Sequence, residues 1–364
     1  MPAHVLLTSR IDRRRLVLAS GATVLAAPFA RLGASAQDSI VATMVTDTAG
    51  IGDESFNDLA LEGGQRAAEE LGIEFNVLES QTAADYVRNL TDAAETSDLT
   101  VAVGFLLQDA LTEVSAQYPD KYFAIIDAVV EGDNVASYIF REQEGAFLAG
   151  VLAGLTTTTG VLGYVGGIRI PPVMRYEVGY VAGIRSVNPG AEILIAYADD
   201  FENPTLGKEL SLAQYNNNAD IVLAAAGRTG IGTFDAAKEK GQGFFVIAAD
   251  QDQSELGAEF QLAAVLKKLD TGVYEACEMV LNNAFEGGPR DIGIAEDGVG
   301  LGFYHQSVSQ DVQNTINAYA AAIASGQIVP PVDDDTLAAF QPVPPAEVGA
   351  SASPAASPEA SPVA

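Results

Sequence analysis

The chain has 364 residues, of which 48% are hydrophobic, and a formal net charge of −30. This length accommodates two domains that each bury a core. Because phosphate binding needs clustered Lys and Arg, the excess of 49 acidic over 19 basic residues argues against a nucleic-acid partner.

The first residues have the pattern of an export signal. Three arginines at 13–15 precede an apolar run over 16–30, and Ala-Ser-Ala follows at 34–36. The run is shorter than the about 20 residues that a transmembrane helix needs. The paired arginines favour a signal peptide of the twin-arginine type over 1–36, while an ordinary secretory signal is the alternative. Cleavage after 36 would leave 14 basic and 48 acidic residues, a net charge of −34.

Two further features carry little chemistry. Residues 343–364 consist mainly of Pro, Ala and Ser without apolar periodicity, which predicts a disordered tail. The single cysteine, Cys277, lies in a helical pattern and cannot form a disulfide within one chain, so we expect it to serve packing.

Between the ends, short apolar runs alternate with helical patterns. Strands are expected at 40–47, 73–79, 99–105, 122–127 and 135–140, with helices at 59–72, 84–96 and 109–118. After a long helix at 141–157, strands are expected at 161–167, 192–198, 220–227 and 244–250, with helices at 175–187, 206–216 and 234–240. Apolar strands separated by helices indicate an α/β fold with two doubly wound, parallel-sheet lobes.

The C-terminal third predicts a hinge between these lobes. A helix over 259–282 is placed to cross back to the first lobe, and residues 297–308 with a helix over 312–324 offer another crossing. We therefore expect lobe 1 over 37–142 plus about 251–300, and lobe 2 over 143–250 plus about 301–342.

Polar residues stand where several strands end. Asp47, Asp127 and Asp250 each close a predicted strand, and Gly227 closes another before a glycine-rich turn. Ligands of doubly wound sheets bind outside the carboxyl ends of the strands, so these residues predict one cleft. The alternative is that each Asp caps a following helix.

Catalytic motifs are scarce. The two histidines, His4 and His305, cannot assemble a Ser-His-Asp triad or a histidine metal site. Carboxylates alone leave a nucleoside hydrolase or a glycosidase open, but no metal loop or phosphate loop accompanies them. We expect a protein that is not an enzyme and uses no metal or cofactor.

Several segments point to a family. The stretches "MVTDTAGIGDESFNDLALEGGQRAAEELG", "FREQEGAFLAGVLAG", "GYVGGIRIPPVMRYEVGYVAGI" and "AAGRTGIGTFDAAKEKG" resemble the basic membrane protein family, over about 40–286. These are solute-binding components of ABC transporters that include the purine nucleoside receptor. The resemblance implies the type I periplasmic binding protein fold. It also implies a monomeric receptor that delivers a purine nucleoside such as adenosine, guanosine or inosine to an ABC permease and its ATPase.

The resemblance also implies a binding site. It assigns Phe56 and Phe201 to the two faces of the base, where each stacking contact contributes about 1–3 kcal/mol. Alternatively, Phe56 packs on its own helix and Phe201 belongs to the core. The other matching positions are Asp47 and Asn57 at the base with Asp127 nearby, Gly227, Asp250 and Lys267 at the ribose, and Val173 in an apolar wall. A surface role is the alternative for Lys267.

Departures from the family pattern limit this transfer. The family's lipid-modified Cys after the signal is replaced by Gln37, which argues for an exported, extracytoplasmic protein that is not a Cys-anchored lipoprotein. Leu61 stands where the family often has Trp. The family's "IDDKSFN" motif is "IGDESFN" in this chain, with Gly52 in place of Asp. Arg228 replaces a glycine beside Gly227 and is placed to reach the ligand. The same fold with another solute, a sugar or a signalling molecule, is the second hypothesis.

Overall fold

A computed structural model describes residues 40–348. The predicted signal peptide over 1–36 and the predicted tail beyond 348 lie outside these described residues.

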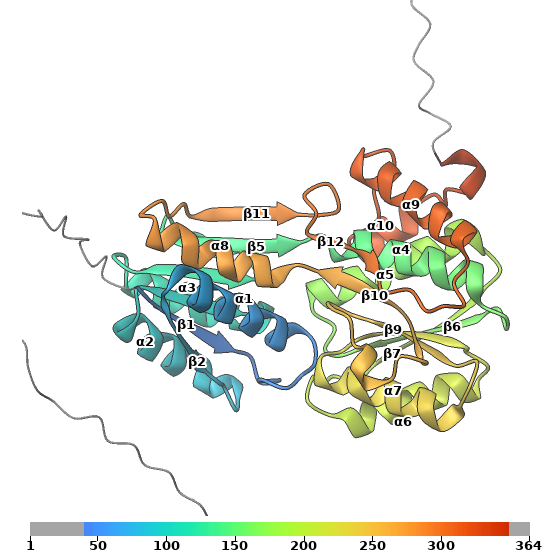
Figure 1. The fold of residues 1–364 in the computed structure, drawn as a ribbon, viewed down its shortest axis with the longest axis horizontal. Helices are drawn as coiled ribbons and strands as arrows, with labels where there is room; N and C mark the ends of the chain where they lie inside the picture. Colours follow the sequence, from blue (N-terminus) through green and yellow to red (C-terminus); the bar gives the residue numbers. More distant parts are fainter. Residues whose placement is uncertain (1–39, 349–364) are drawn as a thin grey trace, which may run out of the picture. The chain divides into compact units, whose positions relative to one another are not determined.

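Lobe 1 is built on a six-stranded sheet in the order β11-β5-β4-β3-β1-β2, all parallel (Figure 1). Its strands are β1 (Val41–Thr46), β2 (Glu74–Leu78), β3 (Leu99–Val103), β4 (Tyr122–Ile126), β5 (Val135–Phe140) and β11 (Gly288–Ile292). One face is covered by α1 (Phe56–Leu71) and α8 (Leu269–Leu281), the other by α2 (Tyr86–Thr96) and α3 (Gln108–Gln117).

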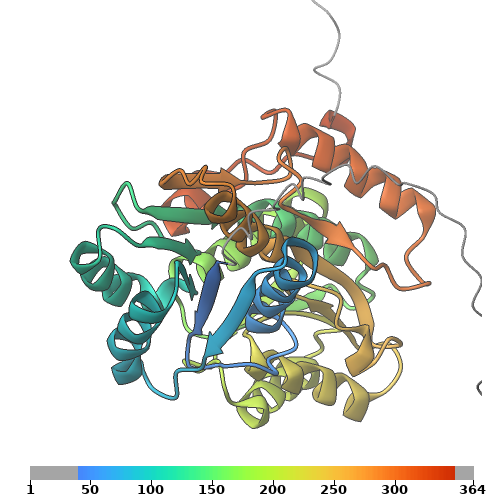
Figure 2. The ribbon, with the colours of Figure 1, turned by 60° about the vertical axis from the view of Figure 1, so that its left-hand side comes forward.

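Lobe 2 repeats this plan in the order β12-β10-β9-β8-β6-β7, with only β12 antiparallel. Its strands are β6 (Val161–Gly166), β7 (Glu192–Tyr197), β8 (Ile221–Ala225), β9 (Phe245–Ala248), β10 (Gln261–Lys267) and β12 (Val299–Gly302). The helices are α4 (Glu142–Thr156), α5 (Pro171–Val187) and α9 (Gln310–Ala324) on one face, α6 (Pro204–Asn216) and α7 (Arg228–Lys240) on the other, and α10 (Asp334–Ala339) beside α5. Figures 1 and 2 both show α9, drawn in red-orange, on the α4 side of this lobe.

The central strands are buried along their whole length because both faces of each sheet are covered. Every residue of β3 and of β8 is buried. Such continuous burial is the mark of parallel sheets between two helix layers. The predicted two-lobed α/β architecture is therefore confirmed.

The chain passes between the lobes three times within the described residues: at 141, between 267 and 268, and over 293–298. Several parallel connections of this kind form a hinge, which restricts the lobes to opening and closing. The second crossing differs from the predicted boundary at about 251, whereas the third agrees with the one at about 300. Residues 251–267 belong with lobe 2, so lobe 1 receives only about 268–298 from the C-terminal third.

The predicted helix over 259–282 is wrong in its first part and confirmed in its second. Its first part is β10, which pairs with β9, and the helix α8 begins only at Leu269. A short apolar run such as "QLAAVLK" cannot be told from a buried helix by periodicity alone.

Other differences lie at element ends. The helices α1, α5, α6 and α7 begin two to six residues earlier than predicted, because their first turns contain polar residues, Pro or Gly rather than the apolar periodicity. The strand β11 and the helix α10 were not predicted. The described start of the predicted tail, 343–348, is ordered against lobe 2: the hydroxyl of Tyr319 donates to the carbonyl of Val343 at 2.6 Å.

Candidate ligand-binding site

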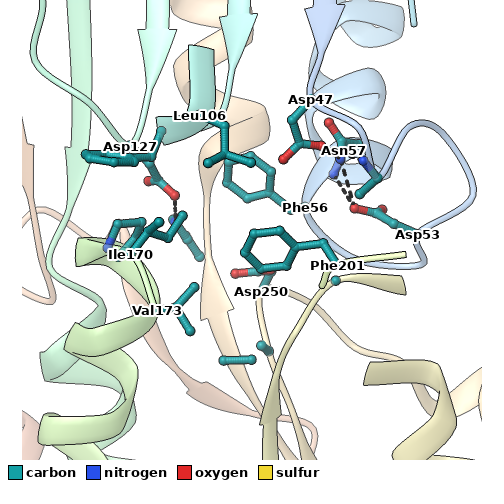
Figure 3. A pocket seen from close by; sticks show the side chains of 18 of the residues that line it. Asp47, Asp53, Phe56, Asn57, Leu106, Asp127, Ile170, Val173, Phe201 and Asp250 are labelled. Carbon is teal, nitrogen blue, oxygen red and sulfur yellow. Dashed lines mark hydrogen bonds and ion pairs between the residues drawn. The ribbon is translucent and has the colours of Figure 1, made fainter. Parts of the chain in front are cut away.

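A cavity lies between the carboxyl ends of the two sheets (Figure 3). The lining residues include every predicted binding residue: Asp47, Phe56, Asn57, Asp127, Val173, Phe201, Gly227, Asp250 and Lys267. The strand-end rule therefore located the cavity, while contact with a ligand stays a prediction.

Two phenylalanine rings enter the cavity from opposite lobes (Figure 3). Phe56 is the first residue of α1, and Phe201 lies in the turn before α6. A glycine makes room for the second ring: an added Cβ at Gly167 would lie 2.3 Å from the Phe201 ring. Each ring is half-buried and packs partly on the core of its own lobe, which fixes its position.

A carboxylate–amide cluster occupies the lobe 1 side of the cavity. The Asn57 amide donates to Asp47 Oδ1 at 3.0 Å and to Asp53 Oδ2 at 3.2 Å. Burial raises the pKa of Asp47 to about 6, although the Asn57 amide and the Ala49 N–H act to lower it. Asn57 Oδ1 is buried without a hydrogen-bond partner within the described structure. The cluster thus retains an unused acceptor next to two carboxylates.

Asp250 of lobe 2 lines the cavity and links the two lobes by hydrogen bonds. Its Oδ2 accepts from the Ser55 hydroxyl of lobe 1 at 2.7 Å, and its Oδ1 accepts from the Tyr176 hydroxyl of α5 at 2.8 Å. Asp250 follows β9, and Asp127 follows the equivalent strand β4 of lobe 1. Both have φ of 68°, a conformation that costs energy in a residue other than glycine and is concentrated at functional sites.

A cluster of buried charges adjoins the cavity, which its members Asp127 and Lys267 line. Lys267 Nζ lies 2.5 Å from Asp127 Oδ2 and 2.8 Å from Glu142 Oε1, while Arg175 Nε lies 2.5 Å from Glu142 Oε2. The Lys267 side chain is 2% exposed, so the surface alternative is wrong. Its ammonium also lies 5.0 Å from the centroid of the Phe56 ring, within cation–π range.

The electrostatics of this cluster follow from its burial. Desolvation alone would raise the pKa of Glu142, but the charges of Lys267 and Arg175 outweigh it and leave that pKa lowered. Desolvation raises the pKa of Asp127 to about 7 even though Lys267 opposes the shift. Desolvation of Lys267 is likewise outweighed, by Asp127, Glu142 and Asp250, so its pKa is raised. The lysine is therefore a permanent cation held by two carboxylates.

Two alternatives can be decided from the geometry. None of Asp47, Asp127 and Asp250 is the N-cap residue of a helix in the described chain; Ser55 holds that position in α1, without a capping hydrogen bond from its side chain. Arg228 does not line the cavity but donates from Nη2 to the Ile51 carbonyl of lobe 1 at 2.6 Å. The expectation that Arg228 reaches the ligand is therefore wrong for this arrangement.

Sequence reasoning missed several lining residues, among them Asp53, Leu106, Ile170, Pro172 and Tyr176. Two signals would have found some of them. Leu106 follows β3, the central lobe 1 strand whose end had not been considered, and Tyr176 lies one helical turn beyond Val173 on the same face of α5.

Comparison with known proteins shows the family to which the chain belongs. The family model described as "ABC transporter substrate-binding protein PnrA-like" matches residues 40–333. The chain belongs to this PnrA-like family. It is similar to the "CD4+ T-cell-stimulating antigen" of Listeria monocytogenes, with 36% identity over 319 residues that cover 82% of this chain and 89% of that protein. It is also similar to the "ABC transporter nucleoside-binding protein BmpA" of Lactococcus lactis, with 32% identity over 312 residues, 80% of this chain and 88% of that protein.

Solved structures agree with the PnrA-like assignment. An ABC transporter solute-binding protein from Aeropyrum pernix superposes with a TM-score of 0.76 and 32% identity, covering 82% of this chain and 96% of that one. The predicted type I periplasmic binding protein fold is confirmed. This PnrA-like chain is thus a solute-binding component of an ABC transporter. Along the stretch 40–348, none of its helices combines the length and the apolarity that crossing a membrane requires.

Proposed function

We propose that this protein is the extracytoplasmic receptor of an ABC importer and binds purine nucleosides in the interlobe cavity without converting them. The observation that carries the proposal is the pair of rings, Phe56 and Phe201, which enter the cavity from opposite lobes. A flat, two-faced ligand would gain about 1–3 kcal/mol from each stacking contact. Because only the closed arrangement offers both rings, such a ligand would favour closure.

The polar groups suit a neutral ligand rich in hydrogen-bond donors. Asp47 and Asn57 offer acceptors near the rings, where the N–H groups of a purine would lie. Asp250 and Lys267 lie on another side of the cavity and would bind the hydroxyls of a ribose. Because Lys267, the one cation among the described lining residues, is already held by two carboxylates, the cavity is unfavourable for the phosphate of a nucleotide.

The name of the Lactococcus lactis relative supports the same ligand class. As a receptor, the protein would act as a monomer and present its closed form to a permease with its ATPase. Closure around the ligand would be the signal for delivery, and the cavity would not catalyse a reaction.

The proposal is tested by calorimetric titration of residues 37–364, refolded after denaturation to remove co-purified ligand. The panel is adenosine, guanosine, inosine, uridine, cytidine, ribose and adenosine monophosphate. We expect tight binding of purine nucleosides and none of ribose or the nucleotide. Phe56→Ala and Phe201→Ala should each weaken binding at least about tenfold, which is about 1.4 kcal/mol.

Phe303→Ala is the matched control, since this ring is 57% exposed and does not line the cavity. Equal affinities in the parent and both cavity variants would contradict the stacking role. Binding of ribose alone would favour a sugar receptor instead. Chromatography of inosine after long incubation with the protein should show no free base, and its release would reveal a hydrolase.

A further inference from the structure

The segment 50–55 is the last part of the connection from β1 to α1 and directly precedes Phe56 and Asn57. Its backbone is unusual, because Gly50, Gly52 and Glu54 have φ of 64°, 84° and 53°. Glycine adopts such values freely, but for Glu54 they cost energy. A strained residue persists only where its surroundings hold it in place.

The N–H groups of this segment are bound within lobe 1. Asp58 accepts from Gly52 at 2.7 Å and from Glu54 at 2.9 Å, and Asp53 accepts from Ser55 at 3.0 Å. The backbone of the segment is therefore fixed to the lobe that carries it, through carboxylates on α1 and on the segment itself.

The oxygen atoms of the segment, in contrast, face lobe 2. Arg228 Nη2 donates to the Ile51 carbonyl at 2.6 Å, and Gln253 Nε2 donates to the Glu54 carbonyl at 2.8 Å. The Ser55 hydroxyl donates to Asp250 at 2.7 Å. Lobe 2 thus holds three positions of a short segment, including the carbonyl of its strained residue.

Both donors are set in place by lobe 2. Gln253 is 9% exposed, and its own N–H donates to Gln261 Oε1 at 2.9 Å. Arg228 is the first residue of α7, whose first turn contains no acidic residue. A cation at a helix N-terminus is unfavourable because the helix dipole is positive there. Its charge-assisted bond to Ile51 offsets that cost only while the lobes are closed.

We propose that Arg228 and Gln253 are positioning residues that hold segment 50–55 against lobe 2, and so orient Phe56 and Asn57 and stabilise the closed arrangement. Neither residue lines the cavity, so their effect on binding is indirect. Because the ligand binds the closed form, apparent affinity scales with the fraction of molecules that are closed. The effect on affinity rests on the proposed nucleoside function, whereas the effect on closure does not.

The test compares the parent with Arg228→Ala, Gln253→Ala and the double variant. Glu113→Cys on α3 and Glu209→Cys on α6 place spin labels at exposed positions of the two lobes, while Cys277 is buried and does not react. Pulsed electron paramagnetic resonance on the ligand-free protein then measures the interlobe distance. We expect each variant to shift the distance distribution away from the closed value, and the double variant to shift it further.

Affinity for the tightest nucleoside of the panel is measured on the same variants. Each single change should weaken it roughly threefold to tenfold, as expected for one hydrogen bond. Arg228→Lys keeps a cationic donor and should restore part of the loss. Arg88→Ala is the control for charge, since this arginine is on α2 and its side chain is 66% exposed.

An unchanged distance distribution in all variants would overturn the proposal, whatever happens to affinity. Weaker binding without a change in distance would mean that Arg228 acts on the ligand rather than on the lobes. If no nucleoside binds to the parent, the proposed function fails, but the distance measurement still decides this inference.

Discussion

Among individual residues, the buried ion cluster has the largest consequence for stability. Lys267 and Arg175 together face Asp127 and Glu142 in a place from which water is nearly excluded. The side chains of Lys267, Asp127 and Glu142 are 2%, 5% and 0% exposed. Burying charges is costly, but removing one partner from an existing pair is costlier still, because the remaining charge has no compensation.

Lys267→Met should therefore lower the free energy of unfolding by about 3–5 kcal/mol. Lys268→Met is the matched control. Lys268 pairs with Asp297 at the surface, and its side chain is 46% exposed, so the loss of this pair should change stability by no more than about 0.5 kcal/mol. Urea denaturation of both variants compares the two effects. If the two variants lost equal amounts of unfolding free energy, removing Lys267 would not leave an uncompensated buried charge.

Asp47 gives stability and binding opposite dependences on pH. Its pKa is raised from 3.8 to about 6, chiefly by burial, so the native state keeps a proton that the unfolded state loses above its own pKa. The stability due to this group is present in acid and is lost as pH rises through about 6. The ionised carboxylate is the stronger acceptor for ligand N–H groups, so affinity should rise over the same interval.

The comparison is between the parent and Asp47→Asn. Unfolding free energy without ligand and nucleoside affinity are both measured at about pH 5 and about pH 7, on either side of the Asp47 transition. In the variant, both unfolding free energy and affinity should change less between the two pH values than in the parent. Changes equal to those of the parent would rule out Asp47 as their source.

The strand-end rule placed Asp47, Asp127, Asp250 and Gly227 at the cavity, whereas the other predicted binding residues were placed there by the family resemblance. An Asp directly after a buried strand must lie at the carboxyl edge of the sheet, whatever the rest of the fold. The direction of a long side chain was not predictable. Arg228 follows Gly227, which lines the cavity, yet its guanidinium binds the backbone of the other lobe.

At the scale of elements, glycine lets helices pack with their backbones nearly in contact. The helices α4 and α5 meet at Gly150, Gly179 and Gly183. An added Cβ at Gly183 would lie 2.0 Å from the carbonyl oxygen of Phe147 in α4, too close for any side chain. The helix α5 carries Val173 and Tyr176 of the cavity, so this packing sets the position of one cavity wall.

Gly183→Ala should lower stability by about 1–3 kcal/mol through overpacking, although alanine is the better helix former. Gly190→Ala serves as the control, because an added Cβ there meets no atom within 4 Å. Thermal denaturation of the two variants measures the difference. A Gly183 variant as stable as the parent would mean that α4 and α5 can separate without cost.

Most elements could be predicted because their burial imposes a simple pattern. Continuous apolar runs gave the central strands, and helical periodicity gave the middle of each helix. The edge strand β11, "GPRDI", has no apolar pattern because it is only partly buried, and it is held by pairing with β5, far away in sequence. Long-range pairing of this kind leaves no local signal.

At the scale of the whole molecule, the two lobes share one strand order, and each is completed by C-terminal segments. Figure 1 shows the orange α8 and β11 lying with the blue and teal elements of lobe 1. The predicted lobe boundaries failed here because the points at which the chain changes lobes depend on which sheet each strand joins, not on composition.

The return of the chain to lobe 1 constrains the order of folding. While the ribosome is still making the first 268 residues, the sheet that will pair with β11 has an open edge, and the apolar face that α8 will cover is exposed to water. Closing that face joins residues far apart in sequence, a slow step that leaves an aggregation-prone intermediate. A nascent chain released early would therefore need protection by a chaperone, and no single cut could liberate lobe 1 as a self-sufficient fragment.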